Sequence, residues 1–267
     1  MASNARMEGK VAIVTGSARG TGATIARLFA EHGARVVVAD VNAEGGESVA
    51  KEIGDAAIFV ETDVTSEDSW ANTVERAESH FGSLNVLVNN AAILHLASVE
   101  DTKAADFERL LAVNTIGPFN GIRASIEAMK RAGGGSVVNI SSIDGLAAKN
   151  GVVAYATSKW GVRGVTKVAA VELGKYGIRV NVVCPEAGSL DMLKPYLPPG
   201  FDPELIDASA HRLLSYQGDR KNAERLKDVA NMVLFLASDE SRSCTGADFA
   251  VDSGYTMGRM LKGVPGS

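Results

Sequence analysis

Short apolar runs alternate along this chain with longer segments whose apolar residues recur at helical spacing. The runs are rich in β-branched residues and almost continuously apolar, as expected for parallel strands that are covered on both faces. Regular alternation of this kind predicts an α/β fold, a doubly wound parallel sheet with helices on both faces and right-handed crossovers. The expected strands are Val11–Thr15, Ala34–Ala39, Ala57–Glu61, Leu84–Asn89, Ser136–Ser141, Arg179–Cys184 and Asp248–Val251. The expected helices are Gly22–His32, Ala43–Ile53, Ser66–Phe81, Lys103–Arg131, Ala154–Lys175 and Asn222–Ala237.

The 267 residues contain no low-complexity or charged linker, so we interpret residues 1–267 as a single domain. The stretch 186–222 interrupts the strand–helix alternation and contains four of the seven prolines. Long insertions in compact domains are often lids or binding loops, so this one is predicted to cover a substrate site. The alternative is an irregular surface loop without a role in binding.

Composition excludes several classes of function. With 27 basic and 32 acidic residues, the net charge of −5 and the lack of a basic run predict no nucleic-acid partner. The longest apolar runs, such as 36–39, are far shorter than the ~18–20 residues that span a bilayer, and residues 1–10 hold no apolar signal segment. Cys184 and Cys244 are too few for a disulfide framework and lack zinc-ligand spacing. We therefore expect a reducing, cytoplasmic setting, no membrane partner and no metal site.

A glycine-rich segment, 15–22, joins the first expected strand to the first expected helix. Its spacing is G-x-x-x-G-x-G. Glycine suits such a turn because it adopts backbone angles that other residues avoid, and because a pyrophosphate must approach the backbone and the helix N-terminus closely. The alternative is a tight turn without a ligand. The residues expected to contact a dinucleotide are Gly16, Arg19, Gly20, Thr21 and Gly22.

An acidic residue, Asp40, ends the second expected strand 18 positions after Gly22. A carboxylate at this place accepts hydrogen bonds from both hydroxyls of an adenosine ribose and repels a 2′-phosphate, which favours NAD over NADP. Val41 follows it and is expected to share the contact. Arg19 argues the other way, because a guanidinium in the loop can bind a phosphate. The alternative interpretation of Asp40 is a solvated turn residue before the next helix.

The ends of the third and fourth expected strands supply further cofactor contacts. Asp63 is placed to accept from the adenine amine, and the Val64 backbone to meet a ring nitrogen. The alternative is an ordinary helix start, because Ser66 is a good N-cap. In the segment 89–92, small residues leave room for a ligand, and the amides can tie adjacent strands together. We expect Asn90 and Ala91 to contact the cofactor.

Tyr155 and Lys159 lie four residues apart in an expected helix and therefore share one of its faces. A phenol has a pKa of ~10 and is a poor base at neutral pH. A nearby ammonium stabilises the phenolate, as does a positive nicotinamide ring, and both are expected to lower that pKa. The pair then serves as general base for alcohol oxidation or general acid for carbonyl reduction. A helix-surface pair without a function is the alternative.

Hydroxyl and amide side chains accompany this pair. Ser142 follows the fifth expected strand, thirteen positions before Tyr155, at the sheet edge where ligands bind. Its hydroxyl can hold the substrate oxygen and stabilise developing charge; Ser141 is the competing candidate. Asn114 lies inside a long expected helix, where asparagine is unfavourable, so a functional role or a kink is expected there.

In this order and spacing, the motifs closely resemble those of the short-chain dehydrogenase/reductases, over nearly the whole chain. The resemblance implies a Rossmann fold whose seven parallel strands lie in the order 3-2-1-4-5-6-7. It also implies a catalytic tetrad of Asn114, Ser142, Tyr155 and Lys159. In that tetrad Lys159 also binds the nicotinamide ribose, and Asn114 holds a water that continues the proton relay. Members commonly pair through their long helices, so a homotetramer is the implied assembly.

Within the family, the passages 84–90, 156–164 and 233–240 look like those of bacterial hydroxysteroid and alicyclic-alcohol dehydrogenases. This implies an NAD-dependent enzyme that interconverts a hydrophobic secondary alcohol, cyclic or steroid-like, and its ketone. One alternative is an NADP-linked carbonyl or 3-oxoacyl reductase, which Asp40 disfavours. Another is a nucleotide-binding scaffold without turnover, which the intact tetrad disfavours.

The nicotinamide end departs from the family pattern. Pro185 is followed by Glu186 where the family usually has glycine. Leu190 stands where a threonine commonly contacts the carboxamide, so Pro185 and Ser189 are the residues expected to meet the cofactor there. Thr21 and Ala92 replace a common aliphatic residue and a common glycine.

Apolar residues of the stretch 190–216 are expected to cover the substrate and exclude water during hydride transfer; ordinary core or subunit contacts are the alternative. These residues are Met192, Leu193, Tyr196, Leu197, Phe201, Leu213, Leu214 and Tyr216. His95, Asp144 and Val153 are further candidates for the pocket wall.

Overall fold

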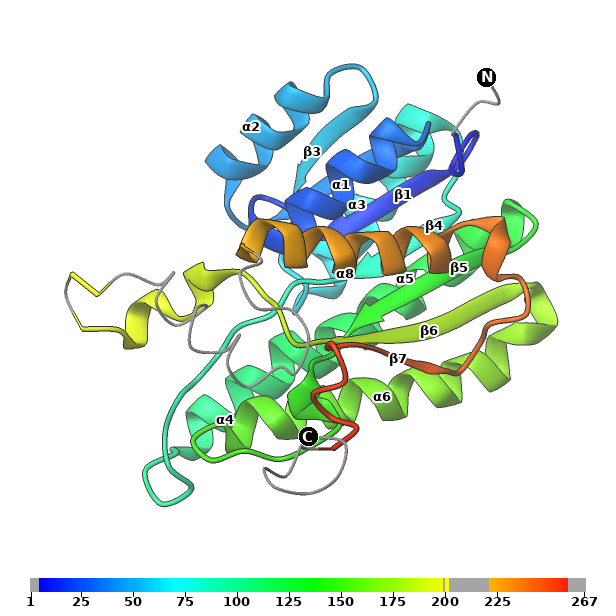
Figure 1. The fold of residues 1–267 in the computed structure, drawn as a ribbon. Helices are drawn as coiled ribbons and strands as arrows, with labels where there is room; N and C mark the ends of the chain where they lie inside the picture. Colours follow the sequence, from blue (N-terminus) through cyan, green and yellow to red (C-terminus); the bar gives the residue numbers. More distant parts are fainter. Residues whose placement is uncertain (1–4, 199, 202–220, 259–267) are drawn as a thin grey trace, which may run out of the picture.

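A seven-stranded parallel sheet forms the centre of the computed structural model, which describes residues 5–198, 200–201 and 221–258 (Figure 1). Its strand order is β3-β2-β1-β4-β5-β6-β7, and all six pairings are parallel. The strands are β1 (Val11–Thr15), β2 (Arg35–Asp40), β3 (Ala57–Glu61), β4 (Val86–Asn89), β5 (Gly135–Ile140), β6 (Ile178–Pro185) and β7 (Asp248–Val251). The predicted Rossmann fold and strand order are confirmed.

Helices cover both faces of this sheet (Figure 1). Side chains alternate between the faces along each strand, so in β1 Ala12 and Val14 pack against α1, α2 and α8, whereas Val11 and Ile13 pack against α3, α5 and α6. The helices are α1 (Gly20–Glu31), α2 (Ala43–Ile53), α3 (Glu67–Phe81), α4 (Ala104–Leu111), α5 (Gly117–Arg131), α6 (Val153–Leu173) and α8 (Asn222–Ala237). Among the described residues, none of these helices is long and apolar enough to cross a membrane.

The segment predicted as one helix, Lys103–Arg131, is divided by a π-helical turn at Ala112–Ile116. Pro118 follows this turn and has no N–H to donate to the carbonyl four residues earlier. The Gly117 N–H instead bonds the carbonyl of Ala112, five residues back, which widens the helix. The predicted helix is therefore present over 104–131 with a π-helical turn inside it, and the expected irregularity at Asn114 lies in this turn.

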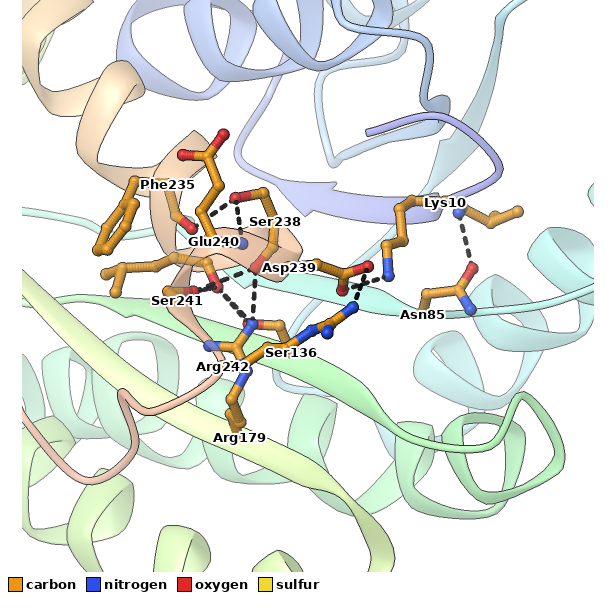
Figure 2. Close-up of polar contacts among 12 residues, drawn as sticks. Lys10, Asn85, Ser136, Arg179, Phe235, Ser238, Asp239, Glu240, Ser241 and Arg242 are labelled. Carbon is orange, nitrogen blue, oxygen red and sulfur yellow. Dashed lines mark hydrogen bonds and ion pairs between the residues drawn. The ribbon is translucent and has the colours of Figure 1, made fainter. Parts of the chain in front are cut away.

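At the edge of the sheet where the strands begin, charged side chains form ion pairs with each other and hydrogen bonds with backbone carbonyls (Figure 2). The Lys10 ammonium lies 2.8 Å from Oδ1 of Asp239. The Arg179 guanidinium donates to the carbonyls of Leu236 and Ser238, at 2.9 and 3.1 Å, where α8 ends. These contacts satisfy carbonyls that a helix leaves without partners at its C-terminus. The opposite edge, where the strands end, holds the candidate site.

Candidate active site

A cavity of about 770 Å³ lies at the carboxyl ends of strands β1, β2, β4, β5 and β6. Ligands of open α/β sheets bind at this edge. Fourteen of the residues predicted from the sequence to act in catalysis or to bind the cofactor line the cavity: Gly16, Arg19, Thr21, Asp40, Val41, Asp63, Val64, Asn90, Ala91, Ser142, Tyr155, Lys159, Pro185 and Ser189. Three of the predicted residues do not line the cavity: Gly20, Gly22 and Asn114.

The glycine positions of the loop leave no room for a β-carbon. Gly16 has a φ of +64°, and a β-carbon there would lie 2.7 Å from Cα of Ala91. A β-carbon at Gly22 would collide with the carbonyl oxygen of Gly16. The turn therefore brings bare backbone to the cavity at the start of α1, whose free N–H groups and dipole favour an anion such as a pyrophosphate.

Two backbone N–H groups hold the carboxylate of Asp40. Its Oδ2 accepts a hydrogen bond from the Ala18 N–H and its Oδ1 from the Asn42 N–H, both at 2.9 Å. A carboxylate has about four lone-pair positions, so each oxygen can still accept from a ribose hydroxyl. The contact to Ala18 also links the end of β2 to the glycine loop. The residues present therefore fit an adenosine dinucleotide.

The groups predicted to meet the adenine are partly occupied by the protein itself. Oδ1 of Asp63 accepts from both the N–H and the hydroxyl of Thr65. The carbonyl of Val64 accepts from the Trp70 indole at 3.0 Å, which leaves the Val64 N–H as its group for a ligand. Asn90 donates to the carbonyl of Gly16 at 3.1 Å and so helps to hold the glycine loop.

Lys159 and Tyr155 lie together on the buried face of α6. The Lys159 ammonium donates to the carbonyl of Ile140 at 2.9 Å and lies 5.5 Å from the centroid of the Tyr155 ring. Burial lowers the pKa of Lys159 to about 8. Burial, followed by the facing carboxylate of Asp144, raises the pKa of Tyr155 above its usual value, and a hydrogen bond with Ser142 lowers it less strongly.

The direction of the Tyr155 pKa shift is opposite to the one predicted from the sequence. The prediction considered the neighbouring ammonium and the positive nicotinamide ring, whereas desolvation of the phenol is the largest cause of the shift within the chain itself. The chain alone therefore does not make this phenol acidic.

The choice between the two serines is decided by their hydrogen bonds. The Ser141 hydroxyl donates to the Lys159 carbonyl at 2.9 Å, which commits it to α6. The Ser142 hydroxyl accepts from the Asp144 N–H at 3.1 Å and lowers the pKa of the Tyr155 phenol. Of the two hydroxyls, Ser142 is thus the one that interacts with the phenol.

Asn114 fastens two elements rather than facing the cavity. Its Oδ1 accepts from the Ile93 N–H at 2.9 Å, while its Nδ2 donates to the Ile93 carbonyl at 2.9 Å and to the Ser158 hydroxyl at 3.0 Å. The segment after β4 is held to α6 in this way. The structure places Asn114 beside the Tyr155 helix but gives its amide three protein contacts.

The glutamate that departs from the family pattern has a partner on another element. Glu186 forms a two-point ion pair with Arg225 of α8, in which Nε lies 2.8 Å from Oε1, and both side chains are buried. Both residues line the cavity. Sequence reasoning missed Arg225 because it lies 39 positions from Glu186, with no local pattern to join them.

The remainder of the wall is mostly apolar. Its apolar members include Ile93, Leu94, Leu96, Val152, Leu190, Met192 and Leu193. Tyr196 donates its hydroxyl proton to the Leu94 carbonyl at 2.8 Å. Asp144 lines the cavity as expected, but Val152 does so in place of Val153, which begins α6, and His95 approaches Asp106 instead. Leu213, Leu214, Tyr216 and most of the stretch 186–222 lie outside the described residues.

No group of three or more His, Cys, Asp or Glu side chains arranged for a metal ion occurs in the described ranges. The site instead combines a glycine loop at a helix start, an acid at the end of β2 and a hydroxyl–phenol–ammonium set, all at one edge of a parallel sheet. These features define a class, the Rossmann-fold oxidoreductases that use a nicotinamide dinucleotide.

Comparison with known proteins agrees with this class. The family model described as "Enoyl-(Acyl carrier protein) reductase" matches residues 16–256. A "3-alpha-(or 20-beta)-hydroxysteroid dehydrogenase" of Mycobacterium tuberculosis is 44% identical over 95% of this chain and 92% of its own length. A "Trans-4-hydroxycyclohexanecarboxylate dehydrogenase" of Sinomonas cyclohexanicum is 41% identical over 96% of both chains. The chain belongs to the short-chain dehydrogenase/reductase family.

Proposed function

We propose that this protein is an NAD-dependent dehydrogenase that interconverts a hydrophobic, cyclic secondary alcohol, steroid-like or smaller, and its ketone. One observation carries the proposal: Ser142, Tyr155 and Lys159 share a largely apolar cavity with a glycine loop and Asp40. The two relatives above are named for a hydroxysteroid and for a hydroxycyclohexane, both cyclic alcohols.

The side chains of the cavity divide the work of alcohol oxidation. The Ser142 hydroxyl donates to the alcohol oxygen and holds it, and Tyr155 removes the hydroxyl proton. The Lys159 ammonium favours the phenolate by its charge and anchors the base through Ile140. A bound nicotinamide dinucleotide supplies the acceptor for the hydride. The apolar wall excludes water from the reacting carbon.

Each part of the dinucleotide would be held by a different residue or loop of the site. The loop around Gly16 receives the pyrophosphate, and Asp40 accepts from the adenosine ribose. Lys159 binds the nicotinamide ribose, and Ser189 meets the carboxamide in place of the missing threonine. Asp40 supports NAD over NADP, because a 2′-phosphate beside it would meet a carboxylate held by two backbone N–H groups.

Tyr155→Phe tests the mechanism. We expect the wild type to form NADH from cyclic secondary alcohols, and the variant to lose about 10²- to 10⁴-fold in kcat/KM. NAD binding, followed by calorimetry, is expected to survive because Phe fills the same space. Substantial turnover by Tyr155→Phe would contradict the assignment of the base.

An NADP-linked carbonyl or 3-oxoacyl reductase is the second candidate, and Arg19 in the cavity wall favours it. Initial rates with NAD and NADP at equal concentration separate the two, with NAD expected to be faster. A scaffold without turnover would form no reduced cofactor with any alcohol.

We also propose a homotetramer in the cytoplasm. Large apolar side chains are exposed at the start of α5 and along α6, among them Phe119, Trp160, Val168 and Val171. Such a surface supports association with other copies of the chain. The two free cysteines fit a reducing compartment. Light scattering during gel filtration tests the assembly, and a monomer would contradict it.

A further inference from the structure

A buried carboxylate lies beside the catalytic hydroxyl. Asp144 belongs to the short 3₁₀ turn Ile143–Gly145, directly after Ser142, and only 5% of its surface is exposed. It lines the same cavity as Ser142 and Tyr155. A carboxylate is rarely buried without partners. The contacts of each oxygen therefore indicate whether Asp144 can still bind a ligand.

All side-chain contacts of Asp144 use one of its two oxygens. Oδ2 lies 2.9 Å from the Lys149 ammonium and 3.5 Å from the Ser142 hydroxyl. Within residues 5–198, 200–201 and 221–258, no donor bonds Oδ1, and this oxygen keeps some accessible surface. This residue of the cavity wall therefore keeps an acceptor oxygen with open lone pairs, and it directly follows Ser142.

The position of this acceptor is fixed before any ligand arrives. The Asp144 N–H donates to the Ser142 hydroxyl, and the Gly145 N–H to the Ser142 carbonyl, at 3.1 and 2.9 Å. Arg163 of α6 donates to the Gly145 carbonyl at 2.6 Å. Pre-organised acceptors bind a donor with little entropic cost.

The charge of Asp144 is already balanced by Lys149, whose side chain is half exposed. A cationic substrate group would therefore gain little from this site and would meet the Lys149 ammonium nearby. A neutral hydroxyl suits the open oxygen better, because it needs an acceptor and brings no charge. The donor must lie close to the reacting carbinol, since Asp144 adjoins Ser142.

We propose that Asp144 is a specificity-determining residue whose Oδ1 accepts a hydrogen bond from a second substrate hydroxyl on the carbon next to the carbinol. The preferred substrates are then cyclic vicinal diols rather than simple cyclic alcohols. The inference rests on the proposed dehydrogenase function. A substrate without the second hydroxyl leaves the carboxylate oxygen desolvated and unpaired, which sites of this kind penalise strongly.

The test compares 1,2-cyclohexanediol, as separate cis and trans isomers, with cyclohexanol as NAD-linked substrates. We expect the wild type to prefer one diol by about 10- to 100-fold in kcat/KM, as for a hydrogen bond to a charged acceptor. In Asp144→Ala this ratio is expected to fall close to one, whichever way the two absolute values move. Lys149→Met is the matched control, because it removes the charge partner but keeps the acceptor and is expected to keep the preference.

Asp144→Asn is the second variant, in case Asp144→Ala folds poorly by circular dichroism. Its amide oxygen still accepts a hydrogen bond without the charge, so an intermediate ratio is expected. A wild-type ratio near one, or the same ratio in wild type and both Asp144 variants, overturns this inference. Turnover of cyclohexanol in that result would still uphold the dehydrogenase. Absence of turnover with every alcohol overturns both.

Discussion

Polar side chains at the two edges of the sheet differ in how fully the chain itself supplies their hydrogen-bond and ion-pair partners. At the amino edge, Lys10 pairs with Asp239, and Arg179 donates to carbonyls at the end of α8 (Figure 2). At the carboxyl edge, Asp144 is buried and Tyr155 half-buried beside a cavity, and Asp144 keeps an oxygen that no donor in the described chain reaches.

This difference separates stability from chemistry. Polar groups whose partners lie within the chain contribute to the folded state. Buried groups with shifted pKa values cost stability, and they are typical of functional sites. The lowered pKa of Lys159 and the raised pKa of Tyr155 both arise first from burial. We therefore expect substitutions at the two edges to have opposite consequences.

The largest effect is expected for Lys159→Met at the carboxyl edge. Losing the ammonium that favours the phenolate should lower kcat/KM by roughly 10²- to 10⁴-fold, measured by NADH formation. Lys167→Met changes a half-exposed lysine of the same helix and should stay active. An active Lys159→Met enzyme would remove the distinction between the edges.

The same variant should be more stable than the wild type at neutral pH. The folded protein holds the Lys159 pKa at about 8 against an ordinary 10.5, so the unfolded chain binds more protons between these values. The free energy of unfolding should then rise with pH across this window, by at most about 3 kcal/mol, with the full penalty present below pH 8. Urea denaturation from neutral to alkaline pH should show this rise in the wild type and not in Lys159→Met. A less stable variant with the same pH slope would contradict it.

Arg179→Met at the amino edge should lower the free energy of unfolding by about 1–2 kcal/mol without changing kcat. The loss is moderate because the Leu236 carbonyl keeps the hydroxyls of Ser136 and Ser241 as donors. Urea denaturation measures it, with Arg123→Met, an exposed ion-pair residue, as control. A fall in activity equal to the fall in stability would show that the edges are coupled.

Asp144→Asn should move the pH profile of cyclohexanol oxidation toward lower pH. The Asp144 carboxylate is, after burial, the second cause that raises the pKa of Tyr155, so its neutralisation lowers that pKa. Lys149→Met should move the profile the other way, because it leaves the carboxylate unbalanced. Plots of log kcat/KM against pH test both directions, and an unchanged profile in both variants would show that the phenol does not sense this pair.

The smallest effect is expected for Lys10→Met. Its partner Asp239 is largely exposed, and exposed ion pairs contribute at most about 1 kcal/mol. The difference in unfolding free energy from the wild type should shrink as salt is added, because salt screens such pairs. A large loss that persists at high salt would mean that the amino edge depends on this one contact.

Local spacing was enough to predict much of this molecule. Successive side chains of a strand point to opposite faces, and both faces of this sheet are covered, so its strands are nearly continuous apolar runs. Runs such as Val11–Thr15 and Ala57–Glu61 therefore predicted strands with the bounds that the structure shows. The shared face of Tyr155 and Lys159 also follows from their spacing in one helix, whereas the crowding at Gly16 comes from Ala91, in a distant part of the sequence. Boundaries elsewhere moved by one or two residues, because capping contacts set helix and strand ends.

The amino-acid sequence by itself determined the order of strands and helices, the loop where a phosphate can approach, and the types of side chain at the end of each strand. Only the tertiary structure decided that Glu186 pairs with Arg225, that Asn114 is bound to Ile93, and that burial raises the pKa of Tyr155. The physical reason is that side-chain periodicity and the backbone preferences of turns act between near neighbours in the chain. Desolvation and ion pairing depend instead on everything that packs around a group, whatever its distance in sequence.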